Sequence, residues 1–516
     1  MKMVIASLLA LLYVTRSMAS VPDVPVVRPS DAVTVDVDAQ TVVRPSFPDK
    51  LFGFNINYRP FQEQLWDSHA GQVYKPILEY LSAFPGALYR YPGGLVADAF
   101  DWTNAVGPLD HRAPQRTVFT MPPARVEFGL DEYLSLLKQV DGSFWYVLNL
   151  VGNDPMNPKK EADEHEVAAA NGRLSKYILD RESGQERYYQ LGNELDRDGY
   201  EWPIDKYISR SRSTMDAIHA VDKDARFVAF LRDFIWTYKK DKSRGVSRPE
   251  DFMAAVLKGL PEIHDYSLHH YYCGKREDGR SRDVAFWMKQ LSASIKTYRS
   301  IRGEEPNIWI TEHSRQMTSD QPGKDLTIQY SSNLGGALCT ADYLIAIAQV
   351  PQIKGAVWHG LNAGPWQLFD ASVHYNDLRP RPVYWMLRVL RSMDLPMVLQ
   401  TSTSSPNKSG NSGGYDVRAV AFSDQSRQRL GLWLVNYDPR PVPVRVNYKP
   451  LASRAVEVKQ TFVAGKEGQD PDDLSLAPDQ SMQSQDQAGK VTQDGALNLV
   501  LPPLSVSSVL VTAAKP

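Results

Sequence analysis

The chain has 516 residues, of which 43% are hydrophobic and 23% charged, and its formal net charge is −2. This is the balance of an ordinary globular protein, and the length favours one large domain with a smaller one beside it. Because the sequence contains no dense run of lysine or arginine, it predicts no basic surface, and we expect no nucleic-acid partner.

The N-terminus has the features of an export signal. Lys2 gives a positive start, residues 3–14 are mostly apolar, and Ser17 and Ala19 supply the small residues that a signal peptidase needs. We therefore expect a signal peptide over residues 1–19 and a secreted or periplasmic protein. The apolar run is shorter than the roughly 20 residues that cross a bilayer, and no later segment has that character, so we expect no membrane partner.

Beyond an expected strand at residues 32–43, apolar runs alternate with stretches of helical spacing. Strands are predicted at residues 51–57, 87–91, 144–150, 187–191, 226–231, 265–271, 307–311 and 355–358. Helices are predicted between them at residues 61–84, 166–179, 209–221, 249–260, 282–302 and 330–349. This alternation predicts an α/β fold, a (β/α)8 TIM barrel over residues 45–392. The alternative is an open doubly wound sheet, which is disfavoured because no G-x-G-x-x-G follows the first strand.

The pattern changes near residue 393. Short alternating runs at residues 415–422, 430–437, 442–448, 455–462, 497–501 and 505–511 predict an antiparallel β-sandwich domain over residues 393–516. The strand within residues 30–44 is expected to join this domain, so that both ends of the chain build it. Residues 402–414 and 465–495 are rich in serine, glycine, glutamine and aspartate, and we expect them to form long loops.

The sequence has two cysteines, Cys273 and Cys339. A core of this size does not need a disulfide, so a disulfide and two free thiols both remain open. Neither cysteine has the spacing of a metal site. We therefore expect no metal and no cofactor.

Two glutamates stand directly after predicted barrel strands. Glu194 follows the fourth strand in Gly-Asn-Glu, and Glu312 follows the seventh in Ile-Thr-Glu. Active sites of such barrels lie at the carboxyl ends of the strands. Retaining glycoside hydrolysis needs two carboxyl groups about 5–5.5 Å apart, one as acid/base and one as nucleophile. The pair predicts Glu194 as the general acid/base and Glu312 as the nucleophile, with a structural ion pair as the alternative for either residue alone.

Other residues at the strand ends are candidates for binding the sugar. Arg90 ends the second strand and could hold Glu312 ionised through a charge-assisted hydrogen bond. His269 and Tyr271 lie two residues apart in the sixth strand and share a face. We expect Tyr271 to donate to Glu312 and His269 to contact the sugar or support the acid. Asn193 is expected to donate a hydrogen bond to the sugar 2-hydroxyl.

Two further strand ends carry candidates, with plain packing as the alternative. Asn149 ends the third strand as a polar residue in an apolar run, and we expect it to bind substrate. Trp358 ends the eighth strand, where a tryptophan can form a platform for the sugar ring. The planar guanidinium of arginine can bind a carboxylate through two hydrogen bonds. If the substrate is a uronic acid, the candidates for binding its carboxylate are Arg59, Arg112 and Arg315.

Several segments together resemble one family of enzymes. They are Arg-Tyr-Pro-Gly-Gly at 90–94, Phe-Asp-Trp at 100–102, Gly-Pro at 107–108 before Arg112, Leu-Asn-Leu at 148–150, Leu-Gly-Asn-Glu at 191–194 and Ser-Leu-His-His-Tyr at 267–271. On these the sequence resembles the clan A retaining glycoside hydrolases, most closely the family 51 α-L-arabinofuranosidases. The resemblance covers the whole barrel and implies a carbohydrate substrate, with Glu194 and Glu312 as the catalytic pair.

The sequence also departs from that family's pattern. Asn57 stands where the family has a sugar-binding glutamate after the first strand, which implies a sugar-binding role for Asn57. Leu95 replaces an asparagine after Pro-Gly-Gly, and the nucleophile lies in Thr-Glu-His-Ser instead of Asp-Glu-Trp. The heparanase-like family 79 glucuronidases and the family 39 xylosidases therefore stay open as relatives. A non-catalytic carbohydrate-binding barrel is a further alternative, and the oligomeric state stays open.

Overall fold

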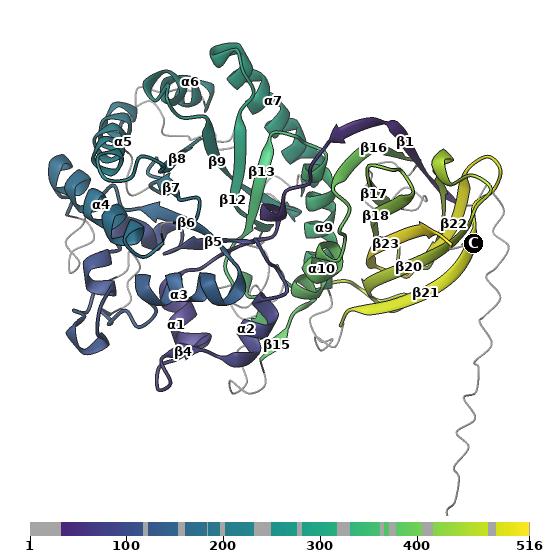
Figure 1. Cartoon of the computed structure of the whole chain (residues 1–516), viewed down its shortest axis with the longest axis horizontal. Helices are drawn as coiled ribbons and strands as arrows, with labels where there is room; N and C mark the ends of the chain where they lie inside the picture. The colour runs from purple at the N-terminus through teal and green to yellow at the C-terminus, as the bar shows by residue number, and fades with distance from the viewer. Residues whose placement is uncertain are drawn as a thin grey trace, which may run out of the picture.

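The computed structural model describes residues 32–116, 122–152, 160–182, 184–196, 202–231, 249–275, 281–316, 331–361, 366–370, 378–404, 416–472 and 481–514. The expected signal peptide lies outside these described residues. Within them the chain forms a barrel and a second, all-β unit, joined through two helices (Figure 1). None of the described helices is both long and apolar enough to span a membrane.

The barrel is a closed ring of parallel strands, which confirms the predicted fold class. In spatial order its strands are β2 (Gly53–Asn55), β5 (Leu88–Tyr91), β6 (Ser143–Leu148), β7 (Tyr188–Leu191), β8 (Arg226–Phe230), β9 (Asp265–Tyr272), β12 (Asn307–Arg315) and β13 (Ile353–Trp358). The main helices around the ring are α1 (Tyr58–Gln64), α2 (Lys75–Leu81), α3 (Leu130–Val140), α4 (Glu164–Leu179), α5 (Ile204–His219), α6 (Pro249–Gly259), α7 (Val284–Arg302), α9 (Leu334–Ala348) and α10 (Pro382–Arg391). Short 3-10 turns η1 (Asp49–Leu51), η2 (Leu95–Ala99), η3 (Trp102–Ala105) and η4 (Leu109–His111) lie in its connections.

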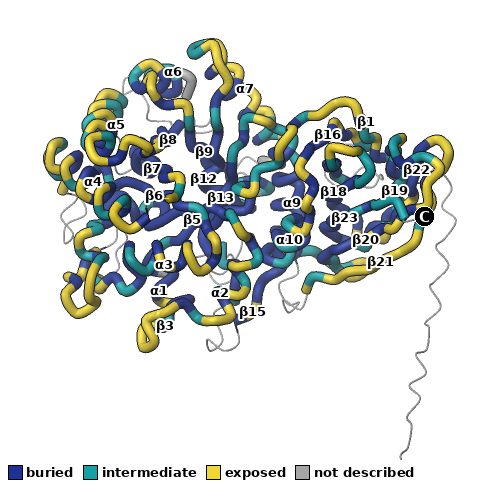
Figure 2. The backbone as a smooth tube through the Cα atoms, viewed as in Figure 1, coloured by how far each residue is buried: buried dark blue, intermediate teal, exposed yellow. Residues whose placement is uncertain are grey.

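The barrel strands are buried on both faces, which is why they appear in the sequence as short apolar runs (Figure 2). Large side chains fill the interior near the amino ends of the strands. Trp145, Tyr188 and Trp309 pack there with ring centroids 4.9–5.4 Å apart. These rings close the barrel interior beneath the carboxyl ends of the strands, where active sites of such barrels lie.

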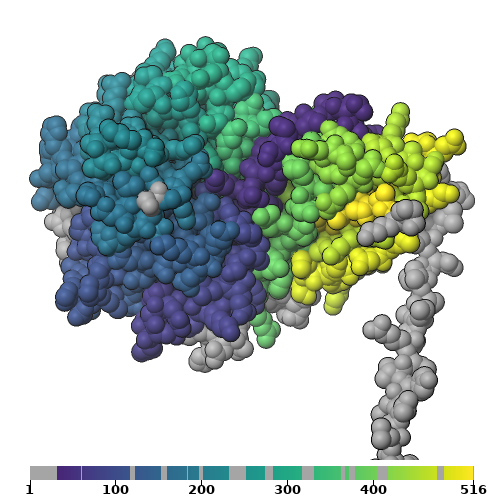
Figure 3. All heavy atoms as spheres, in the orientation of Figure 1, coloured from purple at the N-terminus to yellow at the C-terminus, as the bar shows by residue number. Residues whose placement is uncertain are grey.

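The second unit is one nine-stranded, mostly antiparallel sheet. Its order is β21 (Gln483–Lys490), β20 (Ala455–Ala464), β23 (Ser505–Ala513), β18 (Arg429–Asn436), β17 (Val417–Ser423), β16 (Met397–Thr403), β1 (Val33–Arg44), β19 (Val442–Asn447) and β22 (Ala496–Leu501). The sheet curls around its own apolar core, since a Cβ on Gly489 of β21 would lie 3.4 Å from Leu497 of β22. Strand β1 pairs antiparallel with β16 and parallel with β19, and Figure 3 shows this N-terminal segment beside the C-terminal residues.

Two expected elements differ from the structure. The single helix expected over 61–84 is wrong: α1 and α2 are separated by a small hairpin of β3 (Trp66–Asp67) and β4 (Gln72–Val73). The loop expected over 465–495 is wrong in part, because residues 483–490 form strand β21 along the edge strand β20. The short pairs β10 (Gly274–Lys275) with β11 (Ser281–Arg282) and β14 (Phe369–Asp370) with β15 (Arg379–Pro380), and the turn η8 (Lys449–Leu451), complete the described elements.

Candidate active site

The two predicted carboxylates meet at the carboxyl ends of β7 and β12. One oxygen of Glu194, one oxygen of Glu312 and a ring nitrogen of His269 all lie within 4.8 Å of one another. Glu194 ends a turn after β7 in which both Gly192 (φ +72) and Glu194 (φ +47) are left-handed. A left-handed conformation is uncommon for a residue other than glycine, and such conformations concentrate at functional sites.

Glu312 is aimed by a β-bulge in β12. The pairing with β9 runs from Ile310 opposite Leu268 directly to Glu312 opposite His269, which leaves Thr311 as the extra residue. A bulge bends a strand and redirects the side chains beside it. Here it lets Thr311 hydrogen-bond His269 Nε2 at 3.1 Å while Glu312 points toward the same imidazole.

Both oxygens of Glu312 are held by neighbouring side chains. Arg90 Nη1 donates to Oε1 at 3.0 Å, and the Tyr271 hydroxyl donates to Oε2 at 2.6 Å. Nδ1 of His359 lies 3.2 Å from the same Oε2, and Nδ1 of His269 lies 3.5 Å from it. With only 5% of its side chain exposed, Glu312 is a desolvated and fixed carboxylate.

These neighbours decide the charge of Glu312. Burial alone would raise its pKa, but His269, His359, Arg90 and the Tyr271 hydrogen bond together hold the pKa of Glu312 well below its usual range. Burial also lowers the pKa of His359, so the permanent positive charge beside Glu312 is that of Arg90. Glu312 is therefore ionised at any physiological pH, as a nucleophile must be.

Arg90 is the centre of a buried network and has no exposed surface. Besides Glu312, its guanidinium donates to Gln190 Oε1 and Asn55 Oδ1, both at 2.9 Å, and to Asn193 Oδ1 at 2.6 Å. The predicted contact with Glu312 is thus present, but burial excludes a direct contact with a sugar. Arg90 therefore positions Glu312 and, through Asn193, the turn that carries Glu194.

Glu194 lies in a different environment from Glu312. Its side chain is 23% exposed, and Oε1 lies 2.8 Å from His269 Nδ1. The turn beneath it is held by Asp98, a fully buried carboxylate in η2 that accepts the Asn193 backbone N–H at 3.2 Å. The Nδ2 group of Asn193 makes no hydrogen bond within the described residues, so it can serve a sugar hydroxyl as the sequence predicts.

The Pro-Gly-Gly turn after β5 is pressed against the site. A Cβ on Gly94 would lie 2.5 Å from Glu312 Oε1, and one on Gly93 would lie 2.1 Å from Asn57 Oδ1. Asn57 Oδ1 accepts the Gly94 backbone N–H at 3.1 Å. Asn57 therefore braces this turn beside the nucleophile, and its amide oxygen is already engaged.

Two of the residues expected to bind substrate have structural contacts instead: Asn149 hydrogen-bonds the backbone, and Trp358 packs in the core. Asn149 Oδ1 accepts the N–H groups of Val151 and Gly152 at 2.9 and 2.8 Å, and its Nδ2 donates to Phe100 O. Trp358 is completely buried, so the expected sugar platform at Trp358 is wrong.

A different tryptophan lies beside the catalytic pair. Trp358 Nε1 donates to the carbonyl of Trp366, which is half-buried and stands 4.3 Å from the His359 ring and 6.1 Å from the Tyr271 ring. Sequence reasoning missed Trp366 because it lies eight residues past the strand end, in a loop rather than in a motif. Its ring lies beside two residues that contact Glu312.

The three arginines considered for a uronic acid have acidic partners in the structure. Arg59 pairs with Glu63 at 2.9 Å, Arg112 with Glu132 at 2.8 Å and Arg315 with Asp472 at 2.5 Å. All three are at most 6% exposed. Each arginine belongs to a structural ion pair, so its guanidinium is already bound to a carboxylate of the protein.

The cluster of Glu194, His269 and Glu312 also has the residue types of a metal site. Oε1 of Glu312, however, is bonded to the Arg90 guanidinium, which places a positive charge beside the cluster and disfavours a cation there. The arrangement therefore fits acid/base and nucleophilic chemistry better than metal binding.

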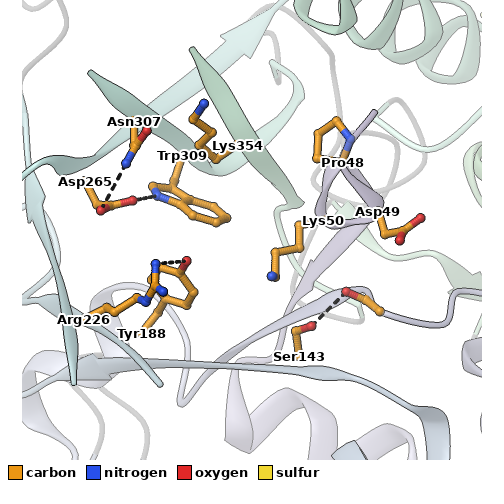
Figure 4. Close-up of a pocket in the computed structure, with 11 residues that line it drawn as sticks. Pro48, Asp49, Lys50, Ser143, Tyr188, Arg226, Asp265, Asn307, Trp309 and Lys354 are labelled. Carbon is orange, nitrogen blue, oxygen red and sulfur yellow. Dashed lines mark hydrogen bonds between the residues drawn. The ribbon is translucent and has the colours of Figure 1, made fainter. Parts of the chain in front are cut away.

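A cavity of about 400 Å³ lies at the other end of the barrel and is not part of this site (Figure 4). Its lining includes the first residues of several strands, among them Ser143, Tyr188, Arg226, Asp265 and Asn307. Catalytic residues of such barrels come from the opposite ends of the strands.

Comparisons with known proteins support the resemblance seen in the sequence. No protein-family model matches the chain. It is similar to the intracellular exo-alpha-(1->5)-L-arabinofuranosidase 1 of Bacillus subtilis, with 27% identity over 270 residues, 47% of this chain and 50% of that protein. The probable alpha-L-arabinofuranosidase C of Aspergillus fumigatus is 23% identical over 216 residues, 39% of this chain and 40% of that protein. The chain spans about half or less of the length of these curated relatives.

Solved structures match over nearly the whole chain. An alpha-L-arabinofuranosidase from Thermotoga maritima in an arabinose complex gives a TM-score of 0.71 at 16% identity, covering 93% of this chain and all of that one. AbfB, a family 51 alpha-L-arabinofuranosidase from Bifidobacterium longum, gives 0.71 at 15% identity, covering 94% and 100%. These matches establish the shared two-domain fold and confirm the resemblance to family 51.

Proposed function

We propose that this chain is a retaining glycoside hydrolase of the α-L-arabinofuranosidase type. The observation that carries the proposal is the approach of Glu194 and Glu312 to within 4.8 Å in unlike environments. Retaining enzymes hold their carboxyl groups about 5–5.5 Å apart, whereas inverting enzymes leave about 6.5–9.5 Å for a water molecule. The close pair supports the retaining mechanism.

The unlike environments of the two carboxyl groups support the predicted division of roles. Glu312 is buried and kept ionised, so its carboxylate attacks the anomeric carbon and forms a covalent glycosyl–enzyme. Glu194 is more exposed, and its carboxylic acid gives its proton to the leaving glycosidic oxygen. Water then enters, Glu194 takes back a proton from it, and the resulting hydroxide displaces Glu312 from the sugar. Retention follows from two successive inversions.

The sugar is proposed from two observations. The curated relatives and the two solved structures compared above are arabinofuranosidases. A uronic acid is disfavoured because the arginines suited to reading its carboxylate already pair with Glu63, Glu132 and Asp472. An unpaired buried charge is costly, so these pairs are not readily exchanged for a ligand.

A substrate panel tests the proposal. Purified protein is assayed with aryl glycosides of α-L-arabinofuranose, β-D-xylose, β-D-glucuronic acid and β-D-galactofuranose, with Glu312→Gln and Glu194→Gln beside it. We expect the arabinofuranoside to turn over and Glu312→Gln to lose at least about 10⁴-fold in kcat, as for other residues of a catalytic unit. Early proton NMR spectra should show the product with retained configuration.

The result can contradict the proposal in separate ways. Turnover that survives Glu312→Gln unchanged would reject the nucleophile. Initial release of the inverted anomer would reject the retaining mechanism. Exclusive turnover of the glucuronide would keep the mechanism and reject the sugar.

We also propose that the protein is exported, on the sequence features of residues 1–19 alone. Expression with its native N-terminus in a Gram-negative host should place the protein in the periplasm, and sequencing of the mature N-terminus should begin near Ser20. Recovery of the full-length chain from the cytoplasm would contradict this.

A further inference from the structure

The two cysteines of the chain come together beside the active site, although they are far apart in sequence. Cys273 directly follows β9 with a left-handed backbone (φ +56), and Cys339 lies in α9, 8% exposed. Their neighbours fix this junction. The Tyr272 hydroxyl donates to Thr340 Oγ1 at 3.1 Å, and its ring stacks on Tyr343 with centroids 4.4 Å apart.

Both thiols are free in the structure, and a hydrogen bond joins them. The hydrogen bond between them raises the pKa of Cys273 and lowers the pKa of Cys339. The positive charge of Arg315 nearby favours the thiolate of both. A thiolate, not a thiol, is the nucleophile in disulfide exchange, so Cys339 is the better nucleophile of the two.

We infer that Cys273 and Cys339 form a disulfide whenever a disulfide oxidant is present, and that this bond ties the end of β9 to α9. The oxidant is a small disulfide such as oxidised glutathione, or an oxidoreductase in its disulfide form. A mixed disulfide first forms on Cys273, the more exposed of the two residues, and releases one thiol of the oxidant. The Cys339 thiolate then attacks the Cys273 sulfur and expels the second thiol. The protein loses two hydrogens and two electrons, and the oxidant gains them.

The bond would join two parts of the molecule that matter to the site. Strand β9 carries His269 and Tyr271, which contact Glu194 and Glu312. Helix α9 packs against the second domain through Asp342, whose carboxylate meets Tyr437 and Arg418. The link therefore makes the position of β9 less dependent on non-covalent packing. The inference of a disulfide does not depend on the proposed glycosidase function.

Thiol counting tests the inference on the full chain. The reduced, purified protein is equilibrated with mixtures of oxidised and reduced glutathione, quenched with acid, unfolded and labelled with a maleimide for mass spectrometry. We expect the wild type to lose both thiols together, with a mass lower by two hydrogens and no bound glutathione. Cys273→Ser and Cys339→Ser, the matched controls, should each keep one thiol or carry one glutathione.

A second readout concerns heat stability. The oxidised wild type should melt several degrees above the reduced wild type, because a cross-link restricts the unfolded chain. The double variant Cys273→Ser, Cys339→Ser should melt at the same temperature in both buffers. A wild type that keeps two free thiols, or carries two glutathiones, in the oxidising buffer would overturn the inference.

Discussion

At the scale of single residues, the hydroxyl of Tyr271 makes a hydrogen bond to Glu312 that a substitution by phenylalanine removes. It donates to Oε2 at 2.6 Å and is one of the groups that lower the pKa of this carboxylate. In Tyr271→Phe the pKa of Glu312 should rise, so the acidic limb of the kcat/KM profile should move to higher pH. Activity at the optimum should fall about 10- to 100-fold, since a hydrogen bond to a charged group contributes roughly 1.5–3 kcal/mol.

Tyr272→Phe is the matched control for this measurement. It removes a buried hydroxyl from the next residue, where the partners are Thr340 and His313. The acidic limb should not move in this variant. Equal shifts in both variants would show that the change reflects general loosening of β9 and not the bond to Glu312.

The residue scale also shows what a sequence can predict about such a site. Glu194, Glu312, His269 and Tyr271 were predictable because each ends or lines a strand whose apolar run is clear. Trp358 ends a strand equally clearly, yet it is buried and anchors the loop of Trp366 through its indole N–H. Which of two tryptophans meets the substrate depends on how a loop folds back, and strand periodicity carries no information on that.

At the scale of elements, the turn after β5 sets the space for the nucleophile. Gly94 has φ −84 and ψ −112, a combination outside the main regions open to residues with a side chain, and an added Cβ would lie 2.5 Å from Glu312 Oε1. We expect Gly94→Ala to lose about 100-fold or more in kcat with the fold retained, because a misplacement of about 1 Å in a catalytic group costs this much. Steady-state kinetics and circular dichroism check this. Gly184→Ala, at an exposed glycine with open space around it, should be unaffected.

The elements that the sequence did not predict have local physical reasons. The 61–84 segment has apolar residues at helical spacing, but Asp67 Oδ1 accepts the N–H groups of His69 and Ala70 and Gly71 takes φ +64, which closes a tight hairpin there. Strand β21 has almost no buried residue, so it shows no alternating pattern. It is a strand because its backbone pairs with β20, and a one-dimensional pattern does not contain that information.

At the scale of the whole molecule, an acidic residue at the junction of the two domains should make stability depend on pH. Burial raises the pKa of Asp342 to about 6 from a usual value near 3.8, despite the nearby Arg418. The folded state therefore holds the proton more tightly than the unfolded state. Stability linked to Asp342 is present below about pH 4 and is lost as the pH rises to about 6.

Asp342→Asn isolates this effect, because asparagine resembles the protonated acid and does not titrate. The difference in melting temperature between the variant and the wild type should grow in favour of the variant from pH 4 to pH 6 and then stay level. The raised pKa corresponds to roughly 3 kcal/mol in all. A difference that does not change with pH would show that Asp342 keeps its charge through its contact with Arg418.

The place of β1 has a consequence for how the protein is made. This strand leaves the ribosome first, yet both of its partners, β16 and β19, belong to the last quarter of the chain. At synthesis rates of about 5–20 residues per second, β1 waits for tens of seconds before either partner exists. The whole barrel can form in that time, while the second domain can close only after β16 and β19 have been synthesised. A fragment cut at the domain boundary would lack a central strand and expose two open strand edges, which invites pairing with other copies.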